Sequence, residues 1–78
     1  MAFYAAGEAI RFGRAYGEIQ DLRRFTEMET NPKRRKEVAS QLVRALEEWG
    51  RNTPPEIRKG MDVNEYVIME FLSSAKLI

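Results

Sequence analysis

FYAAGEAIRFGRAYGEIQDLRRFTEM, residues 3 to 28, is the stretch on which the predicted architecture depends. It contains no proline, and Ala5, Ala9, Gly13 and Gly17 recur in it at every fourth position. An α-helix turns by about 100° per residue, so residues spaced in this way lie on one side of it. The stretch therefore predicts one long helix, at about residues 3–29, with a strip of small side chains along it.

That small-residue strip is the predicted interface. Its members are Ala6, Ala9, Ile10, Gly13 and Gly17. A glycine inside a helix costs about 1 kcal/mol relative to alanine, so close packing against another surface has to offset the glycines. We expect a second backbone to approach along this strip.

A bulkier strip runs along another side of the same helix, roughly 90 to 150° round from the first. It consists of Phe12, Tyr16, Ile19 and Leu22. A helix that is apolar around more than half of its circumference is usually packed on two sides. One strip can face the rest of the chain and the other a second copy. The alternative is a break near Gly13, which would give two short helices in one monomeric core.

The second predicted helix, 32–49, carries the clearest periodicity. Asn31 suits its N-cap and Pro32 its first helical position. Its apolar residues recur at i, i+3, i+4 and i+7, as expected for an amphipathic helix. These residues are Val38, Ala39, Leu42, Ala45, Leu46 and Trp49, with Val43 at the margin. Gly50 is the expected C-terminal stop.

Two further helices complete the predicted chain. A short helix near 54–59 follows the cap-like sequence Thr53-Pro54-Pro55-Glu56 and ends at Gly60. A final helix, at about 62–77, starts from a capping arrangement of Asp62 with Glu65. One face of that helix is predicted to pack into the core, through Val63, Val67, Ile68, Phe71, Leu72, Ala75 and Ile78. The fold class is all-α, a small bundle of three main helices and a short one in a single domain, 1–78.

The predicted helix lengths do not match. At about 1.5 Å per residue the first helix is near 40 Å long, whereas the second and the last are about 27 and 24 Å. A monomeric bundle would leave roughly a third of the first helix bare. Dimerisation through the first helix would cover it, and a domain of this size gains from that, because it buries only about 60% of its unfolded surface alone.

Composition argues against catalysis. The 78 residues include no histidine and no cysteine, which removes the commonest general base, the best nucleophile and the usual transition-metal ligands. We therefore expect no enzyme activity, no cofactor, no metal and no small-molecule substrate. No apolar run approaches the roughly 20 residues of a membrane span, and no secretory signal is recognised, so the expected location is the cytoplasm.

One cluster of a single sign stands out in a chain whose formal net charge is only +1. It comprises Lys33, Arg34, Arg35 and Lys36, with Arg44 and Arg51 as extensions. Cations are unfavourable at a helix N-terminus, where the unpaired amides carry about half a positive charge. Three interpretations remain open: contact with a nucleic-acid backbone, contact with an acidic protein surface, or screening by water and neighbouring glutamates.

The leading functional hypothesis is a small non-enzymatic protein-protein interaction module, a homodimeric regulator, inhibitor or adaptor that binds itself and an unidentified protein. It rests on the excess apolar surface of the first helix and on the missing catalytic residues. The alternative is a small nucleic-acid-binding regulator that uses the basic cluster 33–36.

Overall fold

The computed structural model describes the backbone of residues 6–61 and 63–78, and the side chains of residues 14–61 and 63–78. Within those residues the chain forms four helices and no strand: α1 (Ala6–Met28), α2 (Pro32–Asn52), α3 (Pro55–Gly60) and α4 (Glu65–Ser74). The all-α prediction is confirmed. Residues 3–5, where the first helix was predicted to start, lie outside the described part.

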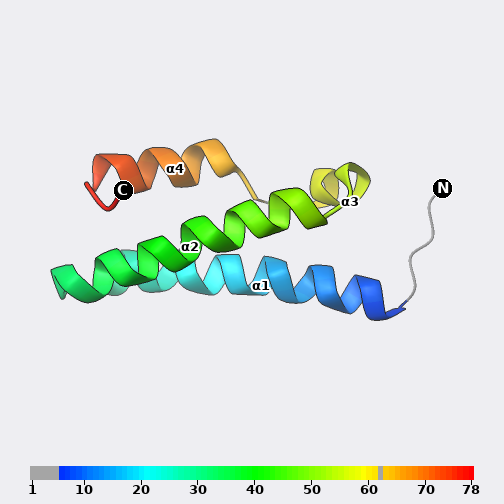
Figure 1. Cartoon of the computed structure of the whole chain (residues 1–78), viewed down its shortest axis with the longest axis horizontal. Helices are drawn as coiled ribbons and strands as arrows, with labels where there is room; N and C mark the ends of the chain where they lie inside the picture. The colour runs from blue at the N-terminus through cyan, green and yellow to red at the C-terminus, as the bar shows by residue number, and fades with distance from the viewer. Residues whose placement is uncertain (1–5, 62) are drawn as a thin grey trace.

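The central element is α2. It forms an antiparallel hairpin with α1, and α4 lies along its other side (Figure 1). The short α3 lies at the C-terminal end of α2, so the chain turns there and α4 runs back toward the start of α2 (Figure 1). The result is elongated, 44 × 20 × 16 Å. One helix thus supplies apolar side chains to two neighbours.

The long first helix is continuous. Its helical backbone passes through Gly13 and Gly17 without interruption from Ala6 to Met28. The alternative of a break near Gly13 is therefore wrong. The N-terminal turns of α1 extend beyond the end of α2 (Figure 1). The predicted mismatch in length between these two helices is wrong for the described residues, since α1 has 23 residues and α2 has 21.

Both ends of α2 are set by local hydrogen bonds. At its start the Asn31 side chain accepts from the amides of Lys33 and Arg34, at 3.0 and 3.2 Å, as predicted for an N-cap. The prediction that Gly50 stops the helix is wrong, because α2 continues to Asn52 and Thr53 is its C-cap. A Cβ at Gly50 would lie 3.4 Å from Oε1 of Glu65, the first residue of α4, which is ordinary contact with the end of a flexible side chain.

The boundaries of the last two helices also differ from prediction. Thr53 makes no side-chain cap for α3, which follows the extended Pro54 instead. The predicted start of α4 at residue 62 is wrong, since the helix begins at Glu65 and Asn64 is the N-cap, accepting from Val67 N at 3.2 Å. Asp62 lies outside the described residues.

The last helix ends at Ser74, three residues earlier than predicted. Lys76 adopts a left-handed φ of 59°, and Leu77 N donates to Leu72 O at 2.9 Å while Lys76 N donates to Ser73 O at 3.0 Å. These two bonds form a Schellman motif, which terminates a helix by satisfying its last carbonyls.

Seven buried apolar residues form the core of the described part. They are Ile19, Ala39, Leu42, Leu46, Trp49, Ile68 and Leu72. Four of these belong to α2, whose predicted apolar periodicity is confirmed. On α4 the predicted face is too wide, because Val67 is 47% exposed and Ile78 is 56% exposed. Ile68 and Leu72, which are fully buried, make the narrower contact.

Trp49 closes one end of this core. It is 5% exposed, and its indole Nε1 donates to Sδ of Met61 at 3.0 Å, which ties the α3–α4 connection to α2. A buried aromatic ring contributes through the apolar area that it removes from water and through its contacts with neighbouring atoms.

We expect Trp49→Ala to lower the free energy of unfolding by about 3 to 5 kcal/mol, enough to unfold most of a domain of ordinary stability. Tyr66→Ala is the matched control, because Tyr66 is an aromatic residue that is 89% exposed. Urea denaturation followed by far-ultraviolet circular dichroism measures both variants. Equal midpoints for the two would show that Trp49 does not anchor the core.

Candidate protein-binding surfaces

The first candidate surface is the side of α1 that faces away from α2. Ile19 is fully buried in the core, and Gly17, two residues earlier, lies about 200° round the helix from it. A Cβ added at Gly17 would meet nothing within 4 Å. No packing within the described chain therefore requires a glycine at this position.

The other residues of the predicted small-residue strip also belong to α1. Ala6, Ala9, Ile10 and Gly13 are helical in α1, and their side-chain surroundings lie outside the described part. Toward the other end, Met28 comes eleven residues after Gly17 and so lies within about 20° of it. Met28 is 69% exposed. The outward side of α1 is thus open at Gly17 and at Met28, and the exposed ion pair of Asp21 with Arg24 lies between these two positions on the same side.

The structure divides the predicted basic cluster. Arg35 points inward, and its Nε donates to the backbone carbonyl of Thr26 on α1 at 2.9 Å. Its guanidinium carbon also lies 5.9 Å from the centroid of the Phe71 ring on α4. Thr26 is fully buried and its hydroxyl donates to Leu22 O at 2.7 Å. Arg35 therefore joins three helices and is not free to bind a partner.

The contact between Arg35 and Thr26 also positions the end of α1. The buried Thr26 keeps the last turns of α1 against α2. Only part of that end is solvated, since Phe25 is 59% exposed beside it. The pairing of Arg35 with a backbone carbonyl carries no periodic signal, so sequence reasoning missed it.

The first-turn amides of α2 are also already bonded. Lys33 N and Arg34 N donate to the Asn31 side chain, and Arg35 N donates to Asn31 O at 2.9 Å. A phosphate bound there would have to displace the Asn31 cap to reach these amides. Any anion binding by the cluster must therefore depend on its side chains.

The remaining cations are exposed, and three of them are aligned. Lys33, Arg44 and Arg51 are separated by eleven and seven residues, which places them within about 20° of one another on α2. Lys36 lies about 60° from this line and Arg34 about 100° from it. The predicted extensions thus join Lys33 on the outward face of α2, whereas Arg34 is on a different side.

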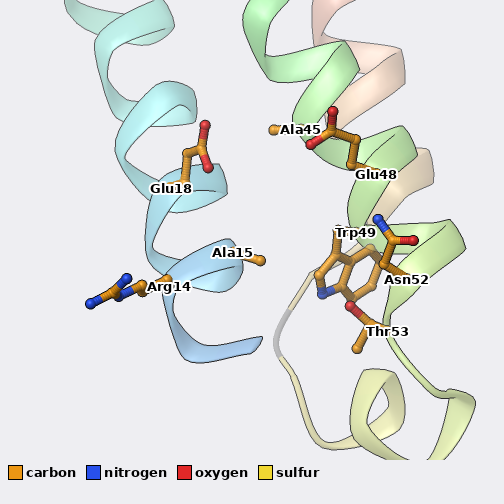
Figure 2. A pocket seen from close by; sticks show the side chains of 8 residues that line it. All are labelled: Arg14, Ala15, Glu18, Ala45, Glu48, Trp49, Asn52 and Thr53. Atoms are coloured by element: carbon orange, nitrogen blue, oxygen red, sulfur yellow. The ribbon is translucent and has the colours of Figure 1, made fainter. Parts of the chain in front are cut away.

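A cleft between α1 and the C-terminal half of α2 was not predicted. It has a volume of about 450 Å³ and is lined by Arg14, Ala15, Glu18, Ala45, Glu48, Trp49, Asn52 and Thr53. Ala15 on α1 and Ala45 on α2 project into the space between the two helices at different levels, and Glu18 and Glu48 border that space from opposite helices (Figure 2). The short alanine side chains leave this space open.

No sequence pattern signals this cleft, because its two carboxylates belong to different helices. Each of them, considered alone, belongs to a solvated helix face. Only the register of the α1–α2 hairpin brings Glu18 and Glu48 to one opening.

Two other kinds of site were sought in the described residues. No group of three or more aspartate, glutamate, histidine or cysteine residues there is arranged to hold a metal ion. None of the described helices has the length and apolar character that crossing a membrane requires.

Comparison with known proteins finds no matching family model, no matching curated protein and no matching solved structure. The chemistry of these surfaces is therefore the basis for inferring the function of the chain.

The inward role of Arg35 is testable by stability. We expect Arg35→Met to lower the free energy of unfolding by about 1 to 3 kcal/mol, because the Thr26 carbonyl loses a charged donor in a partly buried place. Lys36→Met, the same kind of change at the exposed neighbouring position, should stay within about 0.5 kcal/mol. Urea titration compares the two, and an equal loss for both would contradict the assignment.

Proposed function

We propose that this chain is a small non-enzymatic protein-protein interaction module that forms a homodimer through the outward side of α1. In this role it would act as a regulator, inhibitor or adaptor of a second protein. The observation that carries the proposal is the open space at Gly17, where nothing in the described part of the chain gives a reason for a glycine.

The energetic argument concerns the cost of that glycine. Glycine in a helix interior costs about 1 kcal/mol relative to alanine, and α1 contains three, Gly7, Gly13 and Gly17. Close approach of a second helix backbone offsets such a cost, since small residues allow short interhelical distances and many van der Waals contacts. The geometric part of this argument is the same as for small-residue helix pairs in membranes.

The part of α1 that extends past α2 supports the same interface. Its N-terminal turns extend past the end of α2 (Figure 1), and Met28 leaves an apolar side chain exposed near its other end. A second copy lying along the outward side would bury apolar surface in both places. Association of this kind adds to the stability of a small domain by mass action.

The proposal assigns no chemistry to the chain because it has no histidine and no cysteine. A chain without cysteine also suits a reducing compartment, and the cytoplasm is the location that we propose.

Sedimentation equilibrium at micromolar concentration tests the dimer. We expect the wild-type protein to be dimeric and Gly17→Leu to shift it toward monomer, because the leucine side chain would hold the second backbone away. Ser40→Leu, on the exposed side of α2, is the control and should remain dimeric. A monomeric wild type, or a Gly17→Leu variant with unchanged mass, would refute the interface.

Nucleic-acid binding is the second candidate, favoured by the alignment of Lys33, Arg44 and Arg51 on one exposed face of α2. A row of cations along a helix can follow a phosphate backbone and release its counterions. Glu37 and Glu47 are also exposed on α2 and reduce the net charge of that region.

A salt titration of binding to a duplex DNA distinguishes this candidate. Replacing Lys33, Arg44 and Arg51 together by alanine should reduce the slope of log K against log salt by about 3, close to one for each lost phosphate contact. The same number of charges removed from α1, at Arg14, Arg23 and Arg24, is the control. Absence of binding at low salt, or equal slopes for both triple variants, would exclude nucleic-acid binding by this row of cations.

A further inference from the structure

We propose that the cleft between α1 and α2 binds an arginine side chain of a partner protein. The inference rests on the proposed protein-binding function and deepens it by naming the chemistry that the module recognises. The bound chain is a foreign protein, because a second copy on the outward side of α1 occupies a different face: Glu18 lies about 100° round the helix from Gly17.

The apolar part of the cleft fits the stem of an arginine. Ala15 and Ala45 line it from opposite helices at different levels, and the indole of Trp49 lies at one end (Figure 2). Arginine and lysine bury their aliphatic stems along apolar surface while the charged head stays near water or a carboxylate. A cleft of about 450 Å³ is within the size range of ordinary ligand sites.

The charged part of the cleft selects a cation. Glu18 on α1 and Glu48 on α2 line the opening from opposite helices (Figure 2). The ion pairs between described side chains, Arg23 with Glu27 and Arg24 with Asp21, involve neither of them. Arg14 lines the same cleft, but its guanidinium is directed away from α2 (Figure 2). The described lining thus holds two carboxylates, from opposite helices, and one guanidinium, so its net charge is negative.

Guanidinium matches this arrangement better than ammonium does. It is planar, carries five N–H donors in a fixed fork and can bond two carboxylates at once. Lysine has a compact, strongly hydrated charge that gains less from two acceptors on opposite walls. The Asn52 side chain lies at the same opening and adds a neutral polar group to it.

The test is an NMR titration of the full chain with acetyl-Gly-Arg-Gly-amide as the probe. We expect saturable shifts of the backbone amides of Ala15, Ala45 and Trp49, with acetyl-Gly-Lys-Gly-amide binding about five-fold more weakly. The double variant Glu18→Gln/Glu48→Gln should weaken the arginine peptide by at least about five-fold. Its control is Glu37→Gln/Glu47→Gln, with the same change in charge on the exposed side of α2, which should bind as the wild type does.

Several results would overturn the proposal. Shifts that do not saturate, or equal binding of the two peptides, would remove the arginine assignment. Equal weakening in both double variants would show attraction by overall charge only. Circular dichroism establishes that each variant is folded. Sedimentation separates this inference from the dimer, because a dimer that fails to bind the peptide refutes the cleft alone, and a monomer that binds it refutes the dimer alone.

Discussion

The structure depends on one constraint: a single helix, α2, must supply the apolar contacts that bury one side of both α1 and α4. Four of the seven buried core residues come from α2, and they contact α1 on one side and α4 on the other. A chain of 78 residues has little additional apolar surface with which to enclose the outer helices. Their far sides therefore stay in contact with solvent, at Met28 on α1 and at Val67 on α4. The surfaces available for binding are a consequence of this arrangement.

Within that arrangement Arg35 has an unusual role. It belongs to a run of four cations, yet it connects the Thr26 carbonyl on α1 with the Phe71 ring on α4. Positive charge at a helix N-terminus is unfavourable, but a guanidinium bonded to a carbonyl and near the face of a ring recovers part of that cost. Of the four cations at 33–36, Arg35 is therefore structural and the other three are exposed. Fewer cations are available to bind a partner than the sequence alone indicates.

Sequence reasoning succeeded where the physics is local and periodic. The helix from Pro32, its Asn31 cap and its core positions follow from spacing and cap chemistry. It failed where tertiary contacts decide. Gly50 signals a helix end, yet α2 passes through it and continues to Asn52. The cleft required the register of two helices, which no single helix encodes. The open space at Gly17 agrees with the prediction that the small-residue strip does not pack inside the chain. The second copy that would bind along the strip is a prediction.

Trp49 has a consequence beyond stability. It is the single tryptophan of the chain, its ring borders the cleft, and its indole nitrogen is bonded to the Met61 sulfur. Its fluorescence is therefore sensitive on one side to whatever enters the space between α1 and α2, and on the other to the connection that leads into α4. Oxidation of Met61 to the sulfoxide would change the polarity beside the indole without touching the cleft. The fluorescence of Trp49 can therefore report separately on the cleft and on the connection into α4.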